Sequence, residues 1–149
     1  MQSKVTNDGF KGFSSVRLID LPTFNDQRGA LTFIEGNLDI PFNIKRCYYL
    51  HHITMPRGGH AHRETSQIII AVSGSCQMSL SDGEEARIFD LNSPSIGLYF
   101  DPMLWIEIPK FSDDAIILVL ANTHYDSKKT IRDWHEYLDT VQSIKINKC

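Results

Sequence analysis

A pair of histidines, His60 and His62, is the feature of the sequence most able to do chemistry. Residues two apart in a β-strand point to the same face, so both imidazoles should face the same way. Burying two imidazoles inside a small barrel is costly unless they have partners or take part in a reaction. We therefore expect both rings to project into an enclosed space, where they could bind a metal ion or transfer protons.

A metal site would need ligands beyond the two histidines, and the sequence lacks them at the expected places. A carboxylate would be expected four or five residues after His62, where the chain has Ser66 and Gln67. On a later strand, Trp105 is followed by Ile106, which cannot coordinate a metal ion. We expect no bound metal and no other cofactor, with a metal-dependent oxygenase as the alternative.

Acid–base chemistry without a metal suits the same region. An imidazole with a pKa near 6.5 can accept and return protons near neutral pH, and such catalysis contributes about 10²–10⁴-fold. Tyr48 and Tyr49 are neighbours on one strand, so one of them must face inward, where a phenol could stabilise an enolate oxygen. Arg46 shares a face with Tyr48, and arginine suits bidentate contact with phosphate.

Short strands separated by turns surround these candidates. Strand-like runs occur at residues 16–21, 30–35, 44–52, 67–73, 75–80, 86–91, 96–100, 105–108 and 115–122, with 22–29 as a turn-rich connection. Helical spacing appears only near the end, at Ile131, Trp134, Leu138 and Val141, with Asp126 available as the N-cap. The pattern predicts one all-β sandwich or barrel, residues 1–149, with a C-terminal α-helix over 127–141 and a frayed segment over 1–14.

Composition limits the class of protein. The 149 residues are 42% apolar and 22% charged, as in a single globular domain, and the net charge of −3 argues against nucleic acid as the main partner. We find no apolar run of roughly 20 residues and no secretory signal, so we expect no membrane contact. The scattered thiols of Cys47, Cys76 and Cys149 are interpreted as two small core residues and one tail thiol in a cytoplasmic protein.

The order of several short strings resembles a known family. Gln67 and Gly74 follow His62 at the spacing of the first cupin motif, with Gln67 in place of the usual Glu, and Pro102-x-x-Trp105 resembles part of the second. From about residue 16 to 137 the chain is similar to the sugar 3,4-ketoisomerases that act on dTDP-4-keto-6-deoxyglucose. The strings that carry this similarity are Asp26-x-Arg28-Gly29, Lys45-Arg46-x-Tyr48-Tyr49, Arg57-Gly58-x-His60-Ala61-His62, Ser93-Pro94-x-x-Gly97-Leu98-Tyr99, and Tyr125-Asp126 with Ile131-Arg132.

The resemblance implies a cupin barrel (a double-stranded β-helix, or jelly roll) that is a homodimer and binds a dTDP-linked 4-keto-6-deoxy sugar without a metal. It implies that His60 is the base, with His62 beside it and Tyr48 as a third catalytic residue. The resemblance also implies that the protein acts in the synthesis of a deoxy amino sugar, for a polysaccharide such as lipopolysaccharide O antigen. The substrate-binding candidates are Arg28, Arg46, Tyr49, Arg57, Gln67 and Ile106.

Ile106 departs from the family pattern, because the residue after this tryptophan is often His or Arg. The change bears on which face of C4 receives a proton, and it leaves a non-catalytic sugar-binding cupin as one alternative. Another alternative is a dTDP-sugar 3,5-epimerase, which removes a proton beside the ketone but leaves the carbonyl in place. The ketoisomerase-like strings and the short chain favour the ketoisomerase.

Overall fold

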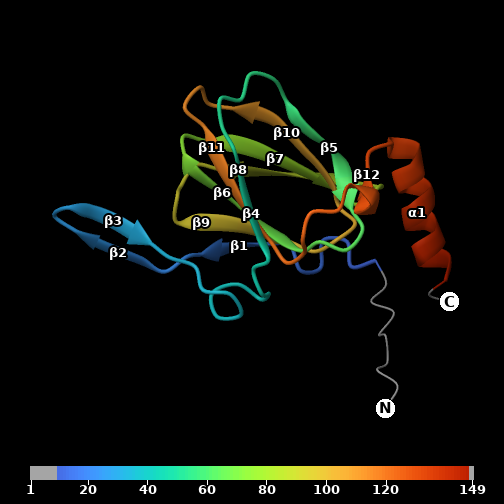
Figure 1. Cartoon of the computed structure of the whole chain (residues 1–149). Helices are drawn as coiled ribbons and strands as arrows, with labels where there is room; N and C mark the ends of the chain where they lie inside the picture. The colour runs from blue at the N-terminus through green and yellow to red at the C-terminus, as the bar shows by residue number, and fades with distance from the viewer. Residues whose placement is uncertain (1–9, 148–149) are drawn as a thin grey trace, which may run out of the picture.

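The computed structural model describes residues 10–147, and its body consists of two five-stranded antiparallel sheets that face each other (Figure 1). One sheet has the strand order β1-β9-β6-β11-β4, the other β12-β5-β10-β7-β8, and β2 pairs with β3 in a separate hairpin. The strands are β1 Arg17–Asp20, β2 Thr23–Asp26, β3 Gly29–Thr32, β4 Arg46–Leu50, β5 Arg57–His62, β6 Gln67–Ser73, β7 Cys76–Ser81, β8 Ala86–Leu91, β9 Ile96–Phe100, β10 Trp105–Phe111, β11 Ile116–Ala121 and β12 Thr130–Ile131.

The solid apolar run of β6 is explained by burial on both of its faces. Ile69 and Ala71 point between the sheets into the main core, while Ile68 and Ile70 belong to a second cluster on the outer face. The connection over residues 34–44 supplies Ile40 and other side chains to this second cluster. The two packed layers confirm the expected all-β barrel with one C-terminal helix.

The C-terminal helix begins later than the sequence pattern suggested. Asp126 caps only a 3₁₀ turn, Ser127–Lys129, and β12 follows it as an edge strand paired with β5. The α-helix α1 spans Trp134–Ile146, with the side chain of Asp133 accepting a hydrogen bond from the backbone N–H of Glu136. The predicted range 127–141 was therefore wrong, because sheet pairing of the buried Ile131 takes precedence over helical spacing.

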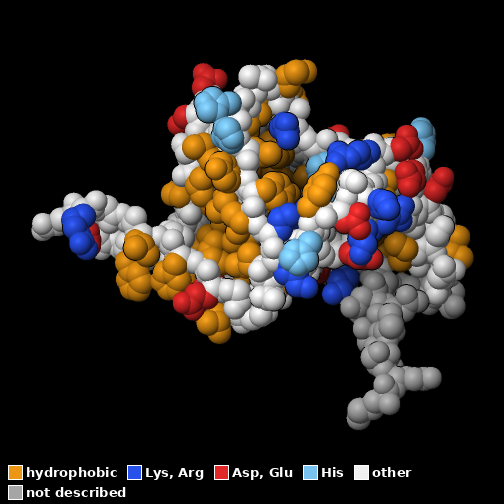
Figure 2. Space-filling model, in the orientation of Figure 1, with side chains coloured by type: hydrophobic (Ala, Val, Ile, Leu, Met, Phe, Trp, Pro, Cys, Tyr) orange, Lys and Arg blue, Asp and Glu red, His pale blue; other side chains and the backbone are white. Residues whose placement is uncertain are grey.

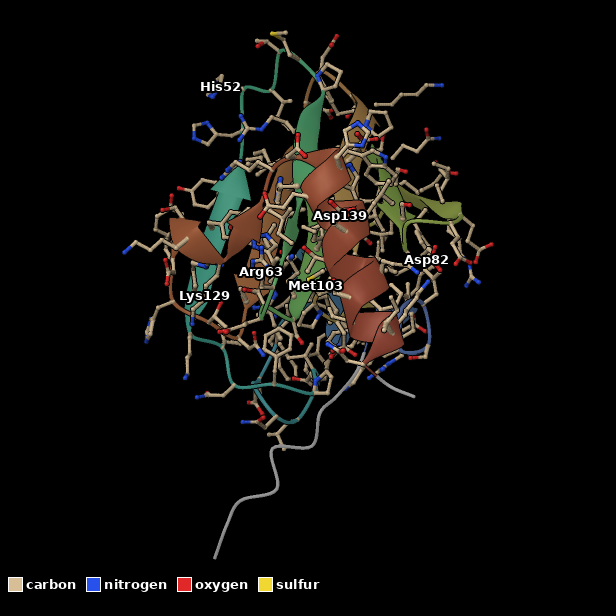
Figure 3. The ribbon with its side chains drawn as sticks, turned by 90° about the vertical axis from the view of Figure 1, so that its right-hand side faces the viewer. His52, Arg63, Asp82, Met103, Lys129 and Asp139 are labelled. Atoms are coloured by element: carbon tan, nitrogen blue, oxygen red, sulfur yellow. The ribbon has the colours of Figure 1, made fainter. Side chains whose placement is uncertain are left out.

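Helix α1 crosses the outside of the barrel (Figure 3) and buries Tyr137 and Val141. The Tyr137 ring lies 5.4 Å from that of Trp105, between ring centroids, and its hydroxyl donates to the backbone oxygens of Ser81 and Met103. This packing holds β12 in place, because Ile131 of β12 belongs to the same buried cluster as Tyr137 and Val141.

The predicted frayed segment, 1–14, is corrected over its second half. Residues 1–9 lie outside the described residues, but Phe13 packs against the main core and Gly12 is buried. The Ser15 hydroxyl then bonds the carboxylate of Asp101, which also accepts hydrogen bonds from Ser66 and Tyr99. Residues 10–15 are thus held against the barrel.

Residues 22–29, predicted as a turn-rich connection, instead begin the hairpin formed by β2 and β3. The hairpin projects away from the barrel (Figure 1) and leaves Phe24 68% and Leu31 60% exposed. The prediction failed because Thr23–Asp26 has little apolar alternation. The segment is a strand because it pairs with β3, and a 2.9 Å hydrogen bond joins the hydroxyls of Thr23 and Thr32.

Two further predictions concern the thiols and the membrane. Cys76 is buried as expected, Cys47 is exposed on the edge strand β4 instead of lying in the core, and Cys149 lies outside the described residues. No helix in the part of the chain that the structure describes is long and apolar enough to cross a membrane.

Candidate active site

A cavity of about 650 Å³ opens between the two sheets, next to the loop over residues 123–132. Side chains from β4, β5, β6, β10 and β11 line it. It brings together seven of the nine residues expected from the sequence, namely Arg46, Tyr48, Arg57, His60, His62, Gln67 and Ile106. Arg28 and Tyr49 do not line the cavity of their own chain.

The two histidines stand side by side on β5, as their spacing predicted. Their ring centroids are 4.9 Å apart and the ring planes meet at 81°. Nδ1 of His60 and Nε2 of His62 are buried, and neither has a hydrogen-bond partner among the described residues. Each ring therefore presents a nitrogen that is withdrawn from water and free to meet a ligand.

A β-bulge directs His60 into the cavity. In the pairing of β5 with β10, His60 lies opposite Ile106 but Gly58 lies opposite Glu107, so Gly59 is an extra residue. Gly58 has φ +100°, and a Cβ atom there would lie 2.5 Å from the backbone oxygen of Ile106. The close approach of the two strands requires glycine at position 58.

The environment of the histidines favours their neutral forms. Burial, followed by the charges of His60, Arg46 and Arg132, lowers the pKa of His62 to about 4. Burial also lowers the pKa of His60; the backbone of Gly58 opposes this shift, and the charges of Arg132 and Arg57 add to it. Both rings are neutral at pH 7 and can accept a proton.

Tyr48 and Gln67 face the cavity from the other sheet. The Tyr48 hydroxyl donates to Oε1 of Gln67 at 3.3 Å, while Nε2 of Gln67 is buried without a partner. Burial raises the pKa of Tyr48, which keeps the phenol protonated and able to donate a hydrogen bond. Tyr49 points outward and is 61% exposed, so its predicted contact with substrate is not made within this chain.

Two of the expected arginines supply positive charge. The Arg46 guanidinium lies 5.4 Å from the ring centroid of Tyr48 and 5.8 Å from that of Tyr125, and its buried Nε has no partner. Arg57 lines the cavity near the start of β5. Among the described residues, neither arginine forms an ion pair.

Arg28 lies elsewhere, at the tip of the projecting hairpin. Its side chain is 90% exposed, and its Nη2 pairs with Oδ2 of Asp26 at 2.5 Å. The structure therefore does not bring Arg28 to the cavity of its own chain, because the β2–β3 hairpin points away from the barrel (Figure 1).

Sequence reasoning missed the loop that closes one side of the cavity. The cavity is lined here by His124, Tyr125, Asp126, Lys129 and Arg132. Tyr125-Asp126 and Ile131-Arg132 were part of the family resemblance, but they were not proposed as site residues, and the predicted helix over 127–141 left no strand at Thr130–Ile131. Recognising β12 as a strand would have placed them.

The set of donors around the histidines does not fit a transition metal. The positions that complete a cupin metal site hold an amide, Gln67, and an alkyl side chain, Ile106. Among residues 10–147, no three His, Cys, Asp or Glu side chains come together in a way that could hold an ion.

Unpartnered polar atoms concentrate at this cavity. Within the described residues, the buried side-chain nitrogen and oxygen atoms without a hydrogen-bond partner are those of four cavity-lining residues, Arg46, His60, His62 and Gln67. Buried polar groups are nearly always hydrogen-bonded, so a cluster of exceptions points to a polar ligand.

Comparison with known proteins gives consistent results. The family model FdtA, described as WxcM-like, C-terminal, matches residues 14–142. The TDP-4-oxo-6-deoxy-alpha-D-glucose-3,4-oxoisomerase of Aneurinibacillus thermoaerophilus is 37% identical over 134 residues, which cover 89% of this chain and 96% of that protein.

Solved structures agree with the sequence relatives. The sugar 3,4-ketoisomerase QdtA of Thermoanaerobacterium thermosaccharolyticum, in complex with TDP, has a TM-score of 0.84 at 39% identity, covering 86% of this chain and 95% of that one. A 3,4-ketoisomerase from Helicobacter canadensis has the same score and identity, covering 86% and 98%. The chain belongs to the FdtA family of cupin-type sugar 3,4-ketoisomerases, and it is an isomerase.

Proposed function

We propose that this protein converts dTDP-4-dehydro-6-deoxy-D-glucose into a dTDP-3-dehydro-6-deoxyhexose by metal-independent acid–base catalysis. The observation that carries the proposal is the cluster of buried, unpartnered polar atoms around the two neutral histidines. The Aneurinibacillus relative is named for the TDP-4-oxo-6-deoxyglucose reaction, and the QdtA structure contains TDP.

The reaction requires only proton transfers. The ketone at C4 acidifies the hydrogen on C3, and His60 removes it as a proton. The C–H electron pair becomes a C3–C4 double bond, and the carbonyl π electrons move onto O4, which gives an enediolate. A proton then returns to C4 from the imidazolium, the O3 hydroxyl passes its proton to O4, and C3 becomes the ketone. The atoms and electrons balance without an oxidant or a reductant.

Side chains on both sheets can assist these steps. Tyr48 keeps its proton and can donate it, in place of its bond to Oε1 of Gln67, to an oxygen on which negative charge develops, and Nε2 of Gln67 offers a second donor. His62, neutral beside His60, can take up or pass on a proton at the neighbouring carbon. Ile106 lies next to His60 on the adjacent strand and keeps water from the base.

Arg46 and Arg57 are proposed to hold the diphosphate. Both line the cavity without an ion-pair partner among the described residues, and guanidinium groups suit phosphate oxygens. Binding energy from the nucleotide, remote from the reacting carbons, can position the sugar against His60.

NMR of the product tests the proposed function. Incubation of dTDP-4-keto-6-deoxyglucose with the protein should move the carbonyl from C4 to C3, and activity should survive treatment with a chelator. A product with an inverted C5 and its ketone still at C4 would identify an epimerase. Binding of TDP with no change in the sugar would identify a binding protein, and activity lost to the chelator and restored by iron or manganese would identify a metal enzyme.

We also propose that the protein is a homodimer assembled through the hairpin. A two-stranded hairpin is marginally stable alone, and this one exposes Phe24 and Leu31. The adjacent outer face of the sheet exposes Tyr49 and Val72, and Figure 2 shows apolar side chains on the hairpin and across the neighbouring barrel surface. In such a dimer, the hairpin of one copy could bring Arg28 to the cavity of the other.

Oligomeric state tests this arrangement. The wild-type chain should elute with twice the monomer mass in size-exclusion chromatography with light scattering, and Phe24→Asp should shift it toward the monomer. An exposed substitution on β8, Ile88→Asp, is the control that should leave the mass unchanged. A monomeric wild-type protein would contradict the proposal.

A ketone newly placed at C3 is the group that an aminotransferase requires, so the product suits the synthesis of a deoxy amino sugar for a surface polysaccharide. Nucleotide sugars are made in the cytoplasm, and the free thiols of Cys47 and Cys76 are compatible with that location.

A further inference from the structure

The register between β12 and β5 places an arginine beside the proposed base. Thr130 pairs with His62 and Ile131 pairs with Ala61. Continued by one residue, this register sets Arg132 opposite His60. Side chains alternate along a strand, so Thr130 and Arg132 point to the cavity while Ile131 points into the core beneath α1.

Within residues 10–147, the charge of Arg132 is not neutralised by an ion pair. Three other arginines, Arg28, Arg63 and Arg87, form ion pairs with carboxylates, but Arg132 forms none among the described residues. The next residue, Asp133, uses its carboxylate to cap α1. The guanidinium of Arg132 is therefore available to an anionic ligand.

The charge of Arg132 is felt at both imidazoles. It lowers the pKa of His60 and of His62, whereas the charge of Arg57 acts on His60 and that of Arg46 acts on His62. Arg132 is thus the arginine whose charge acts on both rings, in agreement with the register that sets it opposite His60.

We propose that Arg132 is a catalytic residue that stabilises the negative charge developing on the sugar oxygen beside His60 during enolisation. The inference rests on the proposed function. When neutral His60 takes the C3 proton, it becomes an imidazolium and leaves an enediolate. A fixed cation beside the oxygen that gains charge stabilises that anion more than it stabilises the neutral ketone, so it lowers the barrier.

Kinetics of Arg132→Ala test the inference, with Arg63→Ala as a matched control. Arg63 is a nearby arginine that pairs with Glu136 on α1 and lies outside the cavity (Figure 3). In Arg132→Ala we expect kcat and the rate of C3 hydrogen–deuterium exchange to fall about 10²–10³-fold, the loss typical of one oxyanion donor. The dissociation constant for TDP should stay within about twofold, and Arg63→Ala should retain wild-type kinetics.

Two further readouts separate an electrostatic role from a structural one. Removal of the Arg132 charge should move the acid limb of the pH–rate profile to higher pH, because the imidazolium of His60 is no longer repelled. Added guanidinium should restore part of the rate of Arg132→Ala, and Arg132→Lys should retain more activity than Arg132→Ala.

The outcomes that would overturn the inference are distinct from failure of the proposed function. Wild-type C3 exchange is measured first, and its absence would contradict the ketoisomerase reaction itself. If wild-type exchange is present, an Arg132→Ala variant with near-normal kcat and TDP binding weakened tenfold or more would assign Arg132 to the diphosphate. Unchanged kcat and unchanged TDP binding would remove it from the site.

Discussion

At the scale of single residues, the alternation of side chains along a strand decides which groups face the cavity. The spacing of His60 and His62 predicted a shared face, and the adjacency of Tyr48 and Tyr49 predicted that one would face inward; both geometries are observed. The sequence could not say which tyrosine it would be, because that depends on the register of β4 against β11. In the structure Leu118 pairs with Tyr49 on the outer face, which leaves Tyr48 inside.

The neutral state of the histidines makes a prediction about pH and rate. Because burial lowers the pKa of His60, the free enzyme should lose its base only below pH 6.5 as the pH falls. The plot of kcat/KM against pH should therefore have an acid limb with a midpoint under 6.5. A midpoint at or above 6.5 would show that the group that must be deprotonated is not His60 in this environment.

At the scale of the elements, strands with a long apolar run could be predicted from the sequence. Strands that form only because a neighbouring strand pairs with them could not. β6 was identified with its exact observed range, Gln67–Ser73, from its apolar run. The hairpin strand β2 and the two-residue strand β12 carry little pattern of their own and exist because partners pair with them. Arg132 was missed for this reason, since its direction depends on β12.

The bulge beside His60 supports a prediction about Gly58. Gly58→Ala should lower the free energy of unfolding by about 1–3 kcal/mol and reduce kcat, because its Cβ would meet the Ile106 backbone and shift His60. Gly59→Ala is the matched control. It also has positive φ, but nothing lies within 4 Å of its Cβ, so it should cost only about 1 kcal/mol.

Urea unfolding at several pH values and steady-state kinetics would check both glycine variants. Equal losses of stability and activity in the two variants would contradict a special role for the strand approach at Gly58.

At the scale of the whole molecule, the all-β class and the single helix followed from the sequence, because turn signals and alternation recur along most of the chain. The arrangement of loops did not follow, since the segments over 10–15, 34–44 and 123–132 are fixed by tertiary contacts. Their residues pack against sheet faces that are formed by distant parts of the chain.

Global stability should depend on pH through the buried histidines. The pKa of His62 is about 4 in the folded chain, below its unfolded value near 6.5, so protonation favours the unfolded state. The free energy of unfolding should fall as the pH drops from 6.5 toward 4, with His62 contributing about 3 kcal/mol of loss at pH 4.

Urea titrations between pH 4 and 8 measure this dependence. The variant His62→Gln, which cannot titrate, should show a shallower slope, with the difference confined to the region below pH 6.5. If the free energy of unfolding of His62→Gln changes with pH as it does in the wild type, the pKa of His62 is not lowered in the folded protein.

His60 is proposed to remove the C3 proton of a bound dTDP-4-keto-6-deoxy sugar. The most direct test is NMR detection of deuterium entering C3 in D₂O, for the wild type and for His60→Asn, with TDP affinity measured alongside. The wild type should exchange C3 hydrogen, and His60→Asn should bind TDP normally while exchange falls by at least about 10²-fold. Exchange at the wild-type rate in His60→Asn would contradict the assignment of the base.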